Sequence, residues 1–111
     1  MRPKTITVTG DALTDEYSPV IPVDWRKPDF KLSIGVVLIG AAAGTYTVQH
    51  TFDDITADDF DATTASWFEH PSLVSLNASQ DGHYAYPPRA IRLKVDAGAS
   101  GDFEMTYIHA G

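Results

Sequence analysis

The sequence contains no cysteine, which excludes disulfides and thiolate metal sites. Positive charge is scarce as well, because eight Lys and Arg stand against fifteen Asp and Glu and give a formal net charge of −7. No Lys or Arg occurs between Leu32 and Pro88. Nucleic acids and anionic membranes are bound through clustered cations, so we expect neither as a partner.

Long hydrophobic runs are also lacking. The longest apolar stretch, residues 34–43, is far shorter than the roughly 20 residues of a membrane-spanning helix. The N-terminus is basic but continues as an alternating pattern, whereas a signal peptide has a continuous apolar core. We therefore expect a protein made in the cytoplasm of its host. A chain of 111 residues suits a single domain, residues 1–111.

Alternating apolar and polar residues dominate the chain, which predicts strands rather than helices. The expected strands cover residues 5–9, 17–23, 31–39, 45–52, 67–76, 91–95 and 102–109. Segment 31–39 is apolar on both faces and should be a central strand covered on both sides, whereas the prolines in 17–23 favour an edge strand. About seven or eight short strands without a long helix predict an all-β fold, an antiparallel, jelly-roll-like β-sandwich.

Several local patterns add detail to this fold. In segment 45–52 one face should point to the core and the other to water; the core-facing residues are Tyr46, Val48, His50 and Phe52. Asp81 and Gly82 predict a turn, and Thr56 followed by Asp59 predicts a single capped helical turn. Strands 91–95 and 102–109 are expected to form a hairpin.

No motif in the sequence assigns a catalytic, cofactor or metal site. Five aspartates in residues 53–61 suggest calcium, but they lack the alternate spacing of a calcium loop, so a solvated acidic loop is the favoured interpretation. The histidines lack the spacing of a local zinc site; they are His50, His70, His83 and His109. No serine lies in a nucleophile elbow, and no glycine-rich loop precedes a lysine. We therefore expect a protein that is not an enzyme.

Three segments occur in order at characteristic spacings: residues 46–54 (YTVQHTFDD), 67–71 (WFEHP) and 81–93 (DGHYAYPPRAIRL). Together they resemble a family of small virion proteins of tailed bacteriophages, the decoration, cement or staple proteins of short-tailed phages. The resemblance implies a jelly roll on the outer surface of the capsid, without catalytic residues or cofactors. It implies that the major capsid protein is the partner, that neighbouring capsomers are tied together, and that the protein pairs as a homodimer on the capsid.

The surface that would meet the capsid is predicted from the few cations and the tryptophan beside them. The tentative partner-binding residues are Arg2, Lys4, Trp25, Arg26 and Lys27. Trp25 lies in an expected loop and is the best candidate for an exposed anchor. The alternative is that the acidic loop of residues 53–61 docks on a basic capsid surface.

Two other functions fit the same sequence. The chain could be a head–tail adaptor or a tail component of the virion. It could also be a carbohydrate-binding module contacting host polysaccharide, in which aromatic rings stack on sugars; the candidates are Trp25, Trp67, Phe68, Tyr84 and Tyr86. Core packing is the ordinary role for Trp67 and Phe68.

Overall fold

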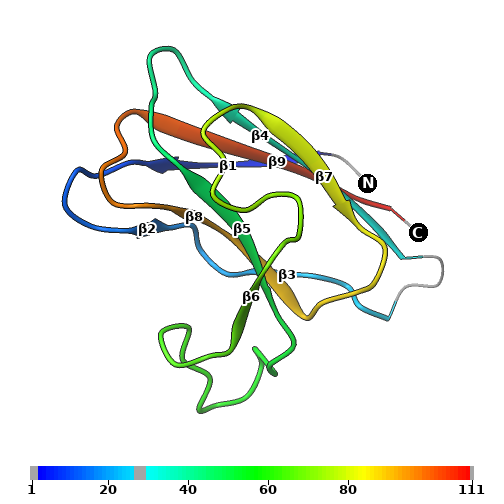
Figure 1. Ribbon diagram of the computed structural model, residues 1–111. Helices are drawn as coiled ribbons and strands as arrows, with labels where there is room; N and C mark the ends of the chain where they lie inside the picture. Colours follow the sequence, from blue (N-terminus) through cyan, green and yellow to red (C-terminus); the bar gives the residue numbers. More distant parts are fainter. Residues whose placement is uncertain (1–2, 27–29, 111) are drawn as a thin grey trace.

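The computed structural model describes residues 3–26 and 30–110, which form nine strands in two sheets (Figure 1). The strands are β1 (Lys4–Thr9), β2 (Glu16–Tyr17), β3 (Ile21–Pro22), β4 (Lys31–Leu38), β5 (Tyr46–Thr51), β6 (Trp67–Glu69), β7 (Gln80–Tyr84), β8 (Ala90–Val95) and β9 (Asp102–Ala110). In these described residues no helix is long and apolar enough to cross a bilayer.

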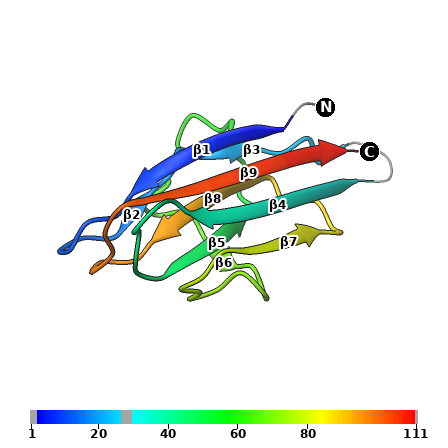
Figure 2. The same cartoon turned by 90° about the horizontal axis from the view of Figure 1, so that it is seen from above.

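The strand order is that of a jelly roll, as the sequence predicts. One sheet has the order β1-β9-β4-β7 and the other β2-β8-β5-β6, with β3 also pairing with β8. All of these pairs are antiparallel. Apart from the β2–β3 and β5–β6 connections, each step along the chain crosses from one sheet to the other. The two sheets lie one in front of the other, with β9 and β4 in front of β8 and β5 in Figure 2. The expected strand over 17–23 is split into β2 and β3, with Pro19 between them.

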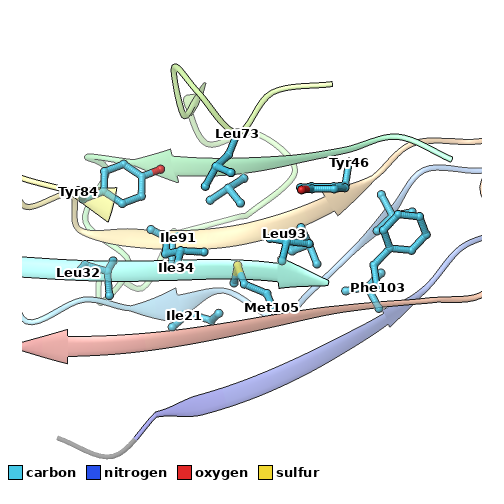
Figure 3. Packing of buried hydrophobic residues seen from close by; sticks show 14 of the residues in the cluster. Ile21, Leu32, Ile34, Tyr46, Leu73, Tyr84, Ile91, Leu93, Phe103 and Met105 are labelled. Carbon is cyan, nitrogen blue, oxygen red and sulfur yellow. The ribbon is translucent and has the colours of Figure 1, made fainter. Parts of the chain in front are cut away.

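The core fills the space between the two sheets. Inward-facing side chains alternate along the central strands; the labelled members in Figure 3 include Leu32, Ile34, Tyr46, Ile91, Leu93, Phe103 and Met105. Each of these is at most 2% exposed. Burial of such a side chain contributes roughly 1.5–3 kcal/mol, so the alternation seen in the sequence is the main reason that two sheets pack face to face. The buried Tyr46 hydroxyl donates to the Ala78 carbonyl oxygen at 2.7 Å.

Strand β4 is central in its sheet, as expected, but it is covered on one face only. It pairs with β9 on one side and β7 on the other. Val37 and Ile39 point away from the core and are 47% and 43% exposed. The prediction of a strand covered on both sides was wrong, because β-branched residues on an outer face look the same in sequence as those in a core.

Strand β5 departs from its prediction in the opposite way, because its polar face is covered. The Thr47 hydroxyl oxygen accepts the Ser75 N–H at 2.9 Å, and the Gln49 carbonyl oxygen accepts the Arg92 Nε–H at 2.8 Å. The segment that contains Leu73 and Ser75 runs alongside β5, where the Val48 N–H donates to the Leu73 carbonyl oxygen at 2.8 Å. Tyr46 and Val48 are buried as predicted, whereas Phe52 extends past the end of the core and is 58% exposed.

Asp81 and Gly82 lie inside β7 rather than in a turn. Gly82 is opposite Ile34 and faces the core. A Cβ at this position would lie 2.8 Å from Leu73 Cδ1 and 3.2 Å from His70 Cε1. The glycine is therefore needed for close packing within a strand, and not for turning the chain.

Strands β8 and β9 do not form the expected hairpin, since β8 pairs with β5 and β9 pairs with β1 and β4. Their connection crosses between the sheets, with Ser100 bridged to Ala43. The expected helical turn at Thr56 is also absent from the described residues. Instead, the carboxylates of Asp54 and Asp61 accept backbone N–H groups two residues later, at 3.0 Å from Thr56 and 2.9 Å from Thr63, and close turns.

Candidate functional site

A surface centred on Trp25 is the first candidate. Trp25 begins a turn after β3, where its N–H donates to the Val23 carbonyl oxygen at 2.9 Å, and Val23 itself is buried in the core. The guanidinium carbons of Arg26 and Arg89 lie 5.1 Å and 4.9 Å from the Trp25 ring centroid. The ring is 40% exposed, so an aromatic face and two cations are presented together at the surface.

Arg89 links this surface to the acidic loop. Its Nη2 donates to Asp54 Oδ1 at 3.0 Å. Hydrogen bonds from Thr56, together with the Arg89 charge, lower the pKa of the exposed Asp54 carboxyl. We call Trp25, Arg26, Arg89 and Asp54 the Trp25 surface. An exposed ion pair of this kind contributes little stability, but it limits the positions that the Arg89 side chain can adopt.

The predicted partner-binding residues are only partly described. Arg2 and Lys27 lie outside the described residues. Lys4 is exposed at the start of β1, opposite Tyr107 of β9. The start of β1 lies at the same end of the sandwich as the start of β4 (Figure 2). The sequence missed Arg89, because nothing in the alternating pattern of 89–95 indicates that its first residue reaches the Trp25 loop.

The second candidate is a cleft at the end of the sandwich, lined by residues near the ends of β5 and β7 and by the segment after β6. It has a volume of about 410 Å³ and its lining includes His50, Phe52, His70, Ser72, Tyr84, Tyr86 and Pro88. We call it the aromatic cleft. The packed core ends beside it at Tyr84, far from Phe103 at the other end of the cluster (Figure 3).

The floor of the aromatic cleft is built from Tyr84 and two histidines. Tyr84 OH and His50 Nδ1 are hydrogen-bonded at 2.8 Å, and the His70 ring meets the Tyr84 ring edge-on with centroids 4.8 Å apart. His70 Nδ1 accepts the Ser72 N–H at 3.1 Å, so its Nε2 carries the proton and donates to the His83 carbonyl oxygen at 2.8 Å. The His70 ring is thereby fixed by hydrogen bonds at both nitrogens.

Burial shifts the pKa values of two groups in this floor, the Tyr84 hydroxyl and the His50 imidazole. It raises the pKa of the Tyr84 hydroxyl far above its usual value. It also lowers the pKa of His50, and the proximity of His70 lowers it further. Both effects have the same physical cause, since a partly dry site disfavours the charged form of each group. Burial therefore favours the neutral forms of Tyr84 and His50 in the floor of the cleft.

Exposed aromatic rings form the rim of the cleft. Tyr86 is 83% exposed. The Phe52 ring lies 5.4 Å from the His50 ring centroid and 5.8 Å from that of Phe68, which itself stacks on His50 at 5.9 Å. Phe68 is exposed, and the expectation that it packs in the core was wrong, because its ring lies with His50 and Phe52 beside the cleft and not among the buried core residues.

The sequence treated the histidines as scattered, yet three of them line this cleft. Nothing in their spacing could have indicated this, because His50, His70 and His83 come from three different segments that only the tertiary fold brings together. Within the described residues there is no group of three or more side chains arranged to hold a metal ion. His109 lies apart from the cleft; it is buried, accepts the Asp24 N–H at 3.2 Å and meets the Phe30 ring edge-on.

The outer face of the second sheet carries an arginine between two rings. The guanidinium carbon of Arg92 lies 4.2 Å from the Tyr17 centroid and 4.0 Å from the Trp67 centroid. The Trp67 Nε1–H donates to the Ala62 carbonyl oxygen at 2.9 Å. This stack ties β2 to β6 across the sheet, which gives Trp67 a structural role outside the core.

Comparison with protein-family models, with curated proteins and with solved structures gives no match for this chain. A function therefore has to be inferred from the fold, the charge and the two surfaces described above.

Proposed function

We propose that this protein is a decoration protein of a tailed bacteriophage, which binds the outer surface of the assembled capsid and ties neighbouring capsomers of the major capsid protein together. The observation that carries the proposal is the Trp25 surface, an exposed tryptophan with the guanidinium carbons of two arginines 5.1 Å and 4.9 Å from its ring centroid, on a protein with a net charge of −7. The jelly roll supports it, because this architecture recurs among capsid proteins.

Tryptophan and arginine are the side chains most enriched at the energetic centres of protein interfaces. Here the rings and guanidiniums are already placed, since Arg89 is bonded to Asp54 at 3.0 Å and also lies over Trp25. A preformed surface loses less side-chain entropy on binding than a flexible one. The two cations would face an acidic patch of the capsid, and the rest of the acidic molecule would stay in water.

A decoration protein does not need a single tight site. Weak contacts repeated over a closed shell give avidity, and a homodimer at a two-fold position of the shell would double the contacts made by each bound unit. We propose such a homodimer on the capsid, with the protein made in the host cytoplasm and carried on the outer surface of the virion.

The test is sedimentation of purified protein with capsids from which it has been removed, with bound copies counted per particle. We expect saturation at hundreds of copies, and capsids that resist heat better once they are loaded. Trp25→Ala should weaken attachment while the isolated domain stays folded by circular dichroism. Leu13→Ala is the matched control, because Leu13 is also exposed and apolar but lies in the loop between β1 and β2.

Three results would count against the proposal. Saturation at a dozen copies or fewer would favour a head–tail adaptor or a tail component. Equal binding by the Trp25→Ala and Leu13→Ala variants would move the contact away from the Trp25 surface. Absence of binding to stripped capsids would remove the decoration function itself.

A further inference from the structure

We propose that the aromatic cleft is a binding site for a neutral pyranose ring of a glycan. This inference uses residues outside the Trp25 surface and holds whether or not the protein attaches to a capsid. It rests on the shape of the cleft, on the absence of formal charge from its lining, and on the combination of exposed ring faces with hydroxyl and imidazole groups.

The size and shape suit a small ring rather than a flat protein contact. The cleft encloses about 410 Å³, within the range of sites for small ligands. Its rim carries Tyr86 at 83% exposure and Phe52 at 58%. Rings so exposed are unusual on a soluble domain unless they contact a ligand or a partner. Flat apolar faces of this kind match the C–H face of a pyranose.

The charge of the lining selects against most other ligands. Among the described residues, none of those that line the cleft is Asp, Glu, Lys or Arg, although these four types make up 21% of the chain. Both ring nitrogens of His70 are engaged within the protein, since Nδ1 accepts the Ser72 N–H at 3.1 Å and Nε2 donates to the His83 carbonyl oxygen at 2.8 Å. A phosphate, a carboxylate or an ammonium would find no counter-charge here, and a nucleic acid would also meet an acidic molecule.

The polar groups of the cleft can form hydrogen bonds with the hydroxyl groups of a sugar. His50 uses Nδ1 for the Tyr84 hydroxyl at 2.8 Å, which leaves its Nε2 to act as a donor in one tautomer and as an acceptor in the other. A sugar hydroxyl can donate or accept, so it matches either tautomer. The Ser72 hydroxyl and the Tyr86 hydroxyl also belong to lining residues and provide further groups of the same dual kind. The Ser72 hydroxyl already lies within 3.3 Å of His70 Nδ1. The groups that a sugar would engage first are therefore His50 Nε2 and the Tyr86 hydroxyl, which a purely apolar ligand would not use.

The cleft is preformed. Tyr84 is fixed by its bond to His50 and by burial against Leu32, its neighbour across the β4–β7 pair. His70 is bonded through both ring nitrogens, and Phe68 lies 5.8 Å from Phe52. Because the groups are already in place, a single ring could bind without first ordering the site.

The experiment has two parts, both on the full chain. Native electrophoresis in gels containing neutral polysaccharides (dextran, galactan and mannan) should show retardation by at least one of them, and much less by an acidic polysaccharide. Nuclear magnetic resonance with the methyl glycoside of the sugar that retards the protein should shift the backbone amides of Ser72 and Tyr86.

The decisive comparison is Tyr86→Ala against Leu13→Ala, which removes an apolar side chain of similar exposure, 87%, at a different loop. Tyr86→Ala should weaken the sugar affinity by roughly tenfold, which is the lower part of the range for replacing a ring that stacks on a nucleic-acid base. Leu13→Ala should leave the affinity unchanged. Tyr86→Ala should also leave capsid attachment intact, whereas Trp25→Ala should leave sugar binding intact.

The inference is overturned if none of the neutral polysaccharides retards the protein. It is also overturned if the Tyr86→Ala variant is retarded as strongly as the wild type, or if the methyl glycoside shifts only amides outside the cleft. Shifts in the cleft with p-cresol but not with any methyl glycoside would show a site for apolar aromatic molecules or side chains, and would equally refute a glycan site.

Discussion

Adding one methyl group at Gly82 should destabilise the fold, whereas adding one at Gly35 should not. The two glycines lie on adjacent strands, since Gly82 of β7 is opposite Ile34 and Gly35 of β4 is opposite Asp81. A Cβ at Gly82 points inward and would lie 2.8 Å from Leu73 Cδ1. A Cβ at Gly35 points outward, with no atom within 4 Å. Neither glycine has a positive φ, so alanine fits both backbones.

The magnitude follows from how firmly Leu73 is held. Its side chain is fully buried, and its carbonyl oxygen accepts the Val48 N–H at 2.8 Å. Leu73 therefore has little room to move away from a contact well inside the roughly 3.5–4.0 Å of carbon–carbon packing. Overpacking of this kind costs roughly 1–3 kcal/mol, and the reduced entropy of the unfolded chain offsets about 0.4–1 kcal/mol of that.

We therefore expect Gly82→Ala to lower the free energy of unfolding by about 1–2 kcal/mol. Gly35→Ala should raise it by up to about 1 kcal/mol. Urea unfolding followed by tryptophan fluorescence measures both, and near-ultraviolet circular dichroism checks that each variant keeps its packing. If Gly82→Ala proved as stable as Gly35→Ala, Leu73 could not be packed against β7 and the inward assignment of Gly82 would be wrong.

Two further changes test the core and the floor of the cleft. Val48→Asp should leave the chain unfolded, because the Val48 side chain is fully buried opposite Leu93 and an unpaired carboxylate there would cost more than about 4 kcal/mol. The control variant Val37→Asp changes an exposed position and should fold. A soluble Val48→Asp variant with an unchanged melting temperature would refute the assignment of the Val48 side of β5 to the core. In the folded protein the pKa of His50 lies below its ordinary value of 6.5, so as the pH falls the unfolded chain binds a proton at this residue before the folded chain does. The contribution of neutral His50 to the free energy of unfolding is therefore present above about pH 6.5 and is lost progressively below it. His50→Gln should therefore lose less stability than wild type between pH 8 and pH 5.5 in urea unfolding, and an equal loss in both proteins would contradict the burial of this imidazole.

Strand positions could be predicted from the sequence because their cause is local. Side chains alternate along a strand, so apolar residues at every second position mark β1, β5, β8 and β9 without any knowledge of their neighbours. The prolines of 17–23 likewise indicated an edge strand, although only the structure showed two short strands, β2 and β3, and their pairing with β8. These signals, with the spacing between them, were sufficient for the sandwich and its jelly-roll character.

Faces and partners were not predictable in this way. Alternation says that a strand has two different faces, but not whether another segment covers the polar one, as the Leu73–Ser75 chain covers Thr47. It also gives no sheet assignment, so β8 and β9 look like a hairpin although they lie in different layers. A glycine in a crowded strand reads in sequence as a turn, because both uses depend on the missing Cβ.

The two candidate sites show the same division. The exposure of Trp25 could be predicted from its loop, since the polar neighbours and the proline that follow it are local features. The cleft could not, because His50, His70 and Tyr84 are placed by pairings between segments far apart in the chain. By itself the sequence determined which residues alternate and how much charge the protein carries; only the tertiary structure decided which side chains meet, since those contacts depend on strand order and not on sequence spacing.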